Sequence, residues 1–278
     1  GARVKTWKKV LGMVTGAAVL LAGYSFFWEP YHLKVTRQTV ELAGVTPFRV
    51  VFFSDTHFGR WYDTKQAEKL AKAITEQQPD VVIFGGDLID QYWRDGAEMD
   101  LSEIAEALAT IQSTYGCYAI WGNHDHGGGA VRVYEQLMGE AGFTVLKNEV
   151  VAPEDAPFQF IGLDDALLGE MELPAWEPME GRATLLLGHE PDDTALFLTD
   201  GMDLALSGHS HGGQVSLPFL TDKIMPKGAC AYSKGWYDIG GNRLFVSSGV
   251  GMTVLPLRFA SGSEICVFEM GEGVTKDD

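Results

Sequence analysis

The sequence predicts an α/β fold that is preceded by one N-terminal transmembrane helix. Three observations predict it: an uncharged apolar run near the N-terminus, short apolar runs that alternate with helical segments up to about residue 146, and strand-rich sequence after that point. Alternation of strand and helix followed by strands is typical of two packed sheets flanked by helices. No Pro-rich or Ser-rich linker divides this part, so we expect one large domain.

The apolar run covers Val10 to Trp28, which is 19 residues without a charge. As a helix it spans about 28 Å, close to the hydrocarbon thickness of a bilayer. Four basic residues precede the run: Arg3, Lys5, Lys8 and Lys9. Aromatic residues lie at its far end: Tyr24, Phe26, Phe27, Trp28 and Tyr31. We therefore expect a single-pass membrane anchor over residues 1–33 and a folded domain over residues 34–278.

The orientation follows from the basic residues before the anchor. By the positive-inside rule, the N-terminus lies in the cytoplasm and the folded domain is extracytoplasmic; the cytoplasmic face is the alternative. A cleaved signal peptide is a competing interpretation, although Gly23-Tyr24-Ser25 is a poor cleavage site. A helix lying on the membrane surface would need a polar face, which this run lacks.

The elements after the anchor follow from periodicity and from capping residues. Apolar positions at helical spacing predict helices over residues 63–77, 101–111 and 130–140, with Asp63 as the N-cap of the first helix. Strands are predicted at nine runs: Phe48 to Phe53, Val81 to Phe84, Tyr118 to Trp121, Thr144 to Val151, Phe158 to Leu163, Thr184 to Leu187 (with Leu185 to Leu187 as its apolar end), Leu204 to Ser207, Leu244 to Ser247 and Glu264 to Phe268.

Five of these apolar runs end at residues that are able to bind a metal. The ends are Ser54-Asp55-Thr56-His57, Gly85-Gly86-Asp87, Gly122-Asn123-His124-Asp125, Gly188-His189-Glu190 and Gly208-His209-Ser210-His211. Because functional groups gather outside the carboxyl ends of strands in an open α/β sheet, we expect the five loops to converge on one point.

The candidate ligands are seven nitrogen and oxygen donors without a cysteine: Asp55, His57, Asp87, Asn123, His189, His209 and His211. Hard and borderline donors of this kind suit Mn, Fe, Zn or Mg. Structural zinc sites draw their ligands from one or two local hairpins, whereas these come from more than half of the chain. Seven donors are too many for one ion, so we expect two divalent ions that share a carboxylate, with Mn preferred over Fe, Zn and Mg.

The five blocks, in this order, resemble the calcineurin-like metallophosphoesterase superfamily over about Pro47 to the C-terminus. The longer strings Ser54 to Gly59, Gly86 to Asp90 and Gly208 to Gln214 are most similar to its small bacterial, membrane-associated branch. That branch includes YkuE-type and YaeI-type phosphodiesterases and UDP-2,3-diacylglucosamine pyrophosphatases. The resemblance implies a four-layer αββα sandwich, with residues 34–278 as the catalytic domain.

The resemblance also implies a role for each residue of the five blocks. One metal would take Asp55, His57 and His211, the other would take Asn123, His189 and His209, and Asp87 would bridge the two. His124 would act as the catalytic histidine that protonates the leaving oxygen or stabilises the developing charge, and Asp125 would orient its imidazole. For Asp90 and Glu190 we expect hydrogen bonding around the site rather than direct ligation.

Composition restricts the substrate. The net charge of −17 argues against a nucleic-acid partner, because phosphate backbones are bound through basic patches. The three cysteines show no pairing pattern, so we expect no disulfide framework, and we infer no obligate protein partner. Arg60 and Lys227 are the candidate phosphate contacts, beside aromatic residues that would suit an apolar tail.

We therefore expect a membrane-anchored hydrolase that cleaves a phosphodiester or pyrophosphate bond of a phosphorylated lipid or nucleotide-lipid, such as UDP-2,3-diacylglucosamine. A phosphomonoesterase of broad range and a metal-binding scaffold without turnover are the alternatives. The lipid A pathway relatives act on a substrate that is made at the inner leaflet, which is the reason to keep the cytoplasmic orientation open.

Overall fold

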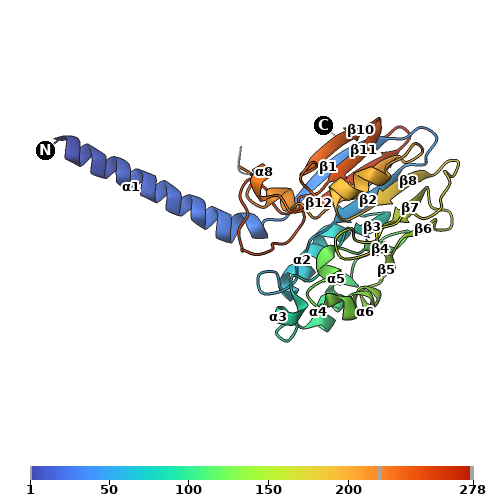
Figure 1. Ribbon diagram of the computed structural model, residues 1–278, viewed down its shortest axis with the longest axis horizontal. Coiled ribbons are helices and arrows are strands. Elements are labelled where there is room, and N and C mark those ends of the chain that lie inside the picture. The colour runs from blue at the N-terminus through green and yellow to red at the C-terminus, as the bar shows by residue number, and fades with distance from the viewer. Residues whose placement is uncertain (1, 218–220, 276–278) are drawn as a thin grey trace.

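The fold is built on two six-stranded sheets that pack face to face (Figure 1), seen in a computed structural model that describes residues 2–217 and 221–275. The first sheet has the order β1 (Lys34–Glu41), β12 (Glu264–Gly271), β2 (Phe48–Phe53), β3 (Val81–Phe84), β4 (Cys117–Ile120) and β5 (Phe143–Leu146). The second has the order β10 (Gly235–Ile239), β11 (Asn242–Val246), β9 (Leu204–Ser207), β8 (Ala183–Leu187), β7 (Phe158–Gly162) and β6 (Glu149–Val151).

Helices cover the outer face of the first sheet. Helices α2 (Thr64–Thr75), α4 (Leu101–Leu108) and α6 (Tyr134–Glu140) bury their apolar sides against it. The outer face of the second sheet has a thinner cover, which consists of apolar side chains from residues 171–176 and from the short pair α7 (Pro191–Thr194) and η4 (Ala195–Phe197). The αββα arrangement expected from the resemblance is therefore confirmed, with a fourth layer that is largely loop.

The space between the sheets is filled by apolar side chains from both. Phe48, Val50 and Phe52 of β2 alternate with residues that face the helices, and they meet Phe158 and Phe160 of β7. Such inward-facing layers, about 10 Å thick, are what hold two stacked sheets together. The residues that follow the parallel strands are thereby brought to one edge of the sandwich.

Two predicted elements are divided in the structure. The run Thr144 to Val151 was expected as one strand, but it breaks at Asn148, which has a left-handed backbone (φ 51°) that Asn tolerates well. The two halves become edge strands of different sheets, so this turn carries the chain from one sheet to the other. The predicted helix 130–140 is likewise a short 3₁₀ turn, η3 (Ala130–Arg132), followed by α6.

Asp63 caps helix α2 as predicted. Its carboxylate accepts hydrogen bonds from the backbone N–H groups of Lys65 (3.0 Å) and Gln66 (3.4 Å). Replacement Asp63→Ala is expected to lower the free energy of unfolding by about 1 kcal/mol, since it leaves these donors without a side-chain partner. Urea denaturation of the full chain in detergent measures the change. Asp63→Asn keeps an acceptor oxygen and should behave like the wild type; an equal loss in both variants would mean that capping is not the cause.

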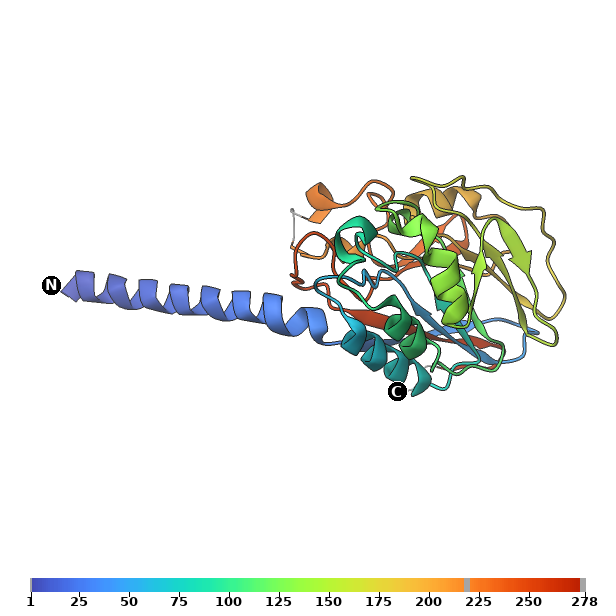
Figure 2. The same ribbon diagram turned by 90° about the horizontal axis from the view of Figure 1, so that it is seen from below.

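The N-terminal segment is a long helix that projects away from the sheets (Figures 1 and 2). Helix α1 (Ala2–Gly23) continues through one π-helical stretch, η1 (Tyr24–Trp28), into a 3₁₀ turn, η2 (Glu29–Tyr31). An 18-residue window within Trp7–Tyr31 has a mean hydropathy of 1.8, and the stretch is long and apolar enough to cross a membrane. Almost none of it is buried against the rest of the chain, unlike a core helix.

Candidate metal centre

The candidate ligands lie where five parallel strands end. Strands β2, β3 and β4 deliver them from the first sheet, and β8 and β9 deliver them from the second. Five of these residues have a left-handed backbone, with φ between 44° and 65°: Asp55, His57, Asp87, His209 and His211. Conformations of this kind cost free energy in residues other than glycine and gather at functional sites, because the surrounding structure must enforce them.

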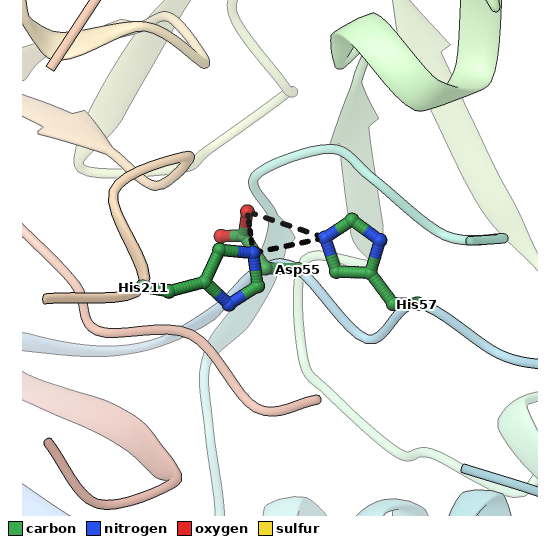
Figure 3. A group of neighbouring side chains, drawn as sticks. All are labelled: Asp55, His57 and His211. Atoms are coloured by element: carbon green, nitrogen blue, oxygen red, sulfur yellow. Dashed lines mark hydrogen bonds and ion pairs between the residues drawn. The ribbon is translucent and has the colours of Figure 1, made fainter. Parts of the chain in front are cut away.

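Asp55, His57 and His211 form one cluster, in which one ligand atom of each lies within 4.8 Å of the others (Figure 3). The two imidazole Nε2 atoms are 3.0 Å apart, and Nε2 of His211 is 3.5 Å from Asp55 Oδ1. All three side chains are buried. Two nitrogens and a carboxylate oxygen that face one another in a buried space form a donor set suited to a divalent ion.

Asp87, His189 and His209 form a second cluster with the same spacing. Oδ2 of Asp87 lies 3.1 Å from His189 Nε2 and 3.5 Å from His57 Nε2, so this carboxylate stands between the two clusters. The neighbouring Asn123 contributes a buried Oδ1 that has no hydrogen-bond partner in the described residues. The arrangement fits the predicted bridging role of Asp87.

Hydrogen bonds on the far side of two imidazoles fix which nitrogen faces the centre. Nδ1 of His189 donates to the carbonyl of Gly85 (2.7 Å), and Nε2 of His209 donates to the carbonyl of Lys227 (2.9 Å). In each ring the other nitrogen therefore faces the centre, which is the orientation of metal-binding histidines. The inward Nε2 of His189 is buried, and the nearest carboxylate oxygen in the described part of the chain belongs to another candidate ligand, Asp87 (Oδ2 at 3.1 Å).

The clusters also shift one another's pKa values. Burial alone would raise the pKa of Asp87, but the imidazoles of His189, His124 and His57 hold it well below its usual range. Burial, together with the charges of His57 and Arg258, lowers the pKa of His211 well below its ordinary value. A carboxylate that stays ionised beside a histidine that stays neutral is the protonation state that metal binding requires.

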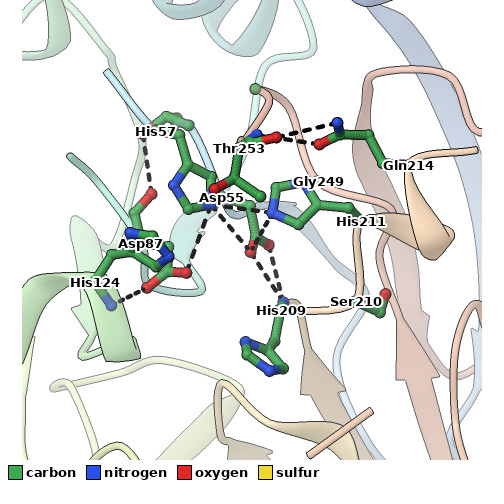
Figure 4. Close-up of polar contacts among 12 residues, drawn as sticks. Asp55, His57, Asp87, His124, His209, Ser210, His211, Gln214, Gly249 and Thr253 are labelled. Carbon is green, nitrogen blue, oxygen red and sulfur yellow. Dashed lines mark hydrogen bonds and ion pairs between the residues drawn. The ribbon is translucent and has the colours of Figure 1, made fainter. Parts of the chain in front are cut away.

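His124 is not in the predicted ligand set, but it forms a third group of potential ligands with His57 and Asp87. Its Nδ1 donates to the carbonyl of Asp90 (2.5 Å), its backbone N–H donates to Asp87 Oδ1 (2.8 Å), and its ring meets that of His57 edge-on (Figure 4). Burial opposes protonation, but Asp87 and Asp90 outweigh it and raise the pKa of His124. The imidazole is therefore suited to donate a proton.

The prediction that Asp125 orients this imidazole is wrong. The carboxylate of Asp125 accepts hydrogen bonds from the backbone N–H groups of Asp87 (2.8 Å), Leu88 (2.9 Å) and Gly122 (2.9 Å). It thus joins the loops after β3 and β4. The orienting contact comes from Asp90, which lies around the site as expected, and whose carboxylate pairs with Arg94.

Asp125→Ala should therefore act on stability. It leaves three buried N–H groups without an acceptor, and a loss of about 3 kcal/mol or more in the free energy of unfolding is expected. Thermal unfolding of the metal-loaded protein measures it. Asp125→Asn keeps one acceptor oxygen and should lose less; full stability of Asp125→Ala together with inactivity would return Asp125 to a catalytic role.

The two predicted phosphate contacts are not in the centre. Arg60 is exposed and lines a separate depression with acidic neighbours, among them Asp63, Asp95 and Glu98. Lys227 acts through its main chain, which holds His209, while its exposed side chain is not part of the pocket lining. Neither residue lines the pocket at the candidate ligands, and the role of each as a phosphate contact stays a prediction.

A cavity of about 550 Å³ opens above the two clusters. Five of the seven candidate ligands line it together with His124, namely His57, Asp87, Asn123, His209 and His211. The rest of its lining is mainly apolar: Val215, Ile224, Pro226, Val254, Leu255 and Leu257. A phosphate-sized group is far smaller than this space, so the apolar walls are available to a second part of the substrate.

Comparison with known proteins agrees with this geometry. Residues 48–213 match the model of the calcineurin-like phosphoesterase family. The chain is 36% identical to the metallophosphoesterase YkuE of Bacillus subtilis (strain 168), over 89% of each chain. It is 29% identical to the phosphodiesterase YaeI of Escherichia coli (strain K12), over 89% of this chain and 92% of that one. It is also 29% identical to a transmembrane protein with a metallophosphoesterase domain of Danio rerio, over 92% of this chain and 61% of that one. The chain therefore belongs to the calcineurin-like phosphoesterase family and is a metal-dependent phosphoester hydrolase.

Proposed function

We propose that the protein is a membrane-anchored phosphodiesterase with two divalent ions, Mn preferred, that acts on a lipid-linked or envelope-related phosphodiester or pyrophosphate. The observation that carries the proposal is the convergence of seven donors from five strand ends, five of which line a largely apolar pocket. One buried carboxylate, Asp87, lies between the two groups of donors.

The residues divide the chemistry between them. Bound divalent ions neutralise the phosphoester charge and activate water, which addresses the main barrier to attack on an anion. Asp55, His57 and His211 would hold one ion, and Asn123, His189 and His209 the other, with Asp87 shared. His124, held by the Asp90 carbonyl, would protonate the leaving oxygen.

The membrane part of the proposal rests on helix α1 and its continuation. The stretch is apolar, exposed and followed by aromatic residues, and a relative in Danio rerio is described as a transmembrane protein. We propose that the helix anchors the chain and that the catalytic domain is extracytoplasmic, as the basic residues before the span favour. The orientation is tested by labelling the exposed thiol of Cys230 and comparing the labelling in intact cells with that in lysed cells.

The substrate part rests on the walls of the pocket. Apolar side chains above a phosphoester centre favour an amphiphilic substrate, such as a phosphorylated lipid or a nucleotide-lipid like UDP-2,3-diacylglucosamine. The net charge of −17 disfavours a nucleic acid.

The test is hydrolysis of bis(p-nitrophenyl) phosphate and p-nitrophenyl phosphate by detergent-solubilised protein that is stripped of metal and reloaded with Mn, Fe, Zn or Mg. We expect diester cleavage that disappears on stripping and returns most strongly with Mn. Cleavage of the monoester alone would favour a phosphomonoesterase. No cleavage of either by protein that holds two ions would favour a metal-binding scaffold.

A further inference from the structure

One wall of the pocket is an uncharged loop, Met252 to Leu257, called the rim loop below. Val254 is 83% exposed and Leu255 is 54% exposed, although both line the pocket. Ile224, at the end of α8 (Thr221–Ile224), is an exposed apolar residue of the same pocket lining. Exposed apolar side chains grouped at a pocket mouth mark a surface that contacts an apolar partner.

Several polar groups of the rim loop form hydrogen bonds to the rest of the protein. The Gln214 side chain donates to the carbonyls of Thr253 (3.1 Å) and Leu255 (3.0 Å) and accepts from the N–H of Thr253 (3.0 Å). The Thr253 hydroxyl donates to Asp90 Oδ1 (3.0 Å) (Figure 4 shows the Gln214 and Thr253 contacts). Val254 is held with φ at 63°, which is rare for a β-branched residue. The loop is thus fixed so that its apolar side chains remain outside.

The rim loop is also tied to the end of the N-terminal helix. The N–H of Arg258, directly after the loop, donates to the carbonyl of Ser25 (3.1 Å), and the N–H of Ala260 donates to Glu29 Oε2 (3.2 Å). Both Ser25 and Glu29 are buried. Figures 1 and 2 show the segment beside the end of α1 in both views. The pocket mouth therefore has a fixed position next to the apolar helix.

We infer that the rim loop rests in the headgroup–acyl boundary of the bilayer that the helix crosses, so that the pocket opens onto the lipid surface and receives the hydrocarbon chain of a membrane-resident phosphodiester. This inference rests on the proposed function and its membrane anchor. The exposed Trp28 and Tyr24 at the helix end are the residue types found at this depth. Because a net charge of −17 opposes binding to anionic lipid, the docking depends on apolar contact and should be insensitive to salt.

Two diesters with the same leaving group test the site: ethyl and hexadecyl p-nitrophenyl phosphate, with the full chain reconstituted in phosphatidylcholine vesicles. We expect kcat/KM for the hexadecyl ester to exceed that for the ethyl ester by at least about tenfold. The double replacement of Val254→Ser and Leu255→Ser should reduce this ratio by about tenfold. The matched control is Leu196→Ser, at a 79% exposed apolar residue outside the pocket, which should leave both rates unchanged.

A spin label measures the docking without relying on activity. Leu255→Cys in a Cys230→Ser background carries the label, since Cys117 and Cys266 are buried. In vesicles, a label at position 255 should collide more with oxygen than with a nickel chelate, which is the behaviour of a label that lies in lipid. A label introduced by Leu196→Cys should show the reverse.

The outcomes separate this inference from the proposed function. If the wild type hydrolyses the ethyl ester but shows no chain preference, or if the label at 255 is more accessible to nickel, the inference is overturned while the proposed function stands. A label in water would also favour a protein partner for the rim loop. If neither ester is hydrolysed by protein that holds two ions, the proposed function fails, and the label still decides whether the loop docks.

Discussion

Asp87→Asn is expected to lower phosphodiesterase activity by at least about three orders of magnitude. The carboxylate lies 3.1 Å from His189 and 3.5 Å from His57, between the two clusters, so it is the one charge that both ions would share. An amide has one acceptor oxygen and no charge. Two bound ions would stabilise the charge of the transition state by several kcal/mol. A change of about 1.4 kcal/mol in the activation free energy changes the rate about tenfold, so loss of the bridge should remove most of the catalysis.

Metal content is the second measurement on this variant. Purified Asp87→Asn should hold fewer than two ions per chain, with its fold retained by circular dichroism. The matched control is Asp155→Asn. Asp155 is exposed and has φ at 58°, close to the 62° of Asp87, so the same substitution is made in a similar backbone conformation. Full activity in Asp87→Asn, or an equal loss in the control, would contradict the bridging role.

The centre was largely predictable from the sequence because its ligands follow apolar strands directly. Parallel strands place their carboxyl ends at one edge, so the seven donors could be assembled before any distance was known. What the chain order could not settle was the choice between Asp90 and Asp125 as the partner of His124. That choice depends on how the loops after β3 and β4 meet, and the three backbone N–H groups that surround Asp125 take its carboxylate away from the imidazole.

The elements missed lie at edges and in loops. Strands β1 and β10 bury few side chains, so they lack the apolar run that reveals a central strand. Arg60 lines a separate depression, and Lys227 acts through its main chain. Both features depend on loop conformation, which the type of residue does not determine. Arg258 was also missed: it is fully buried, its side chain donates to the carbonyls of Ser248, Gly251 and Ser261, and nothing in the local sequence distinguishes it from a surface arginine.

His124→Ala should lower turnover by about 10² to 10⁴ while both ions are retained, because the imidazole donates a proton but is not in the predicted ligand set. The size of the loss should depend on the leaving group. An alkoxide leaving group needs the proton, whereas p-nitrophenolate leaves readily without it. Cleavage of a dialkyl phosphate should therefore fall much further than cleavage of bis(p-nitrophenyl) phosphate.

The matched control is His126→Ala, at a histidine two residues away whose Nε2 bonds Asp164 (2.7 Å) and whose ring stacks on Trp121, outside the pocket lining. It should change turnover only a few-fold. Equal losses on both leaving groups in His124→Ala would mean that the imidazole stabilises charge on the phosphoryl oxygens rather than protonating the leaving oxygen. Because Asp87 and Asp90 raise the pKa of His124, they favour its protonated form, and the leaving-group dependence is the result that this arrangement requires.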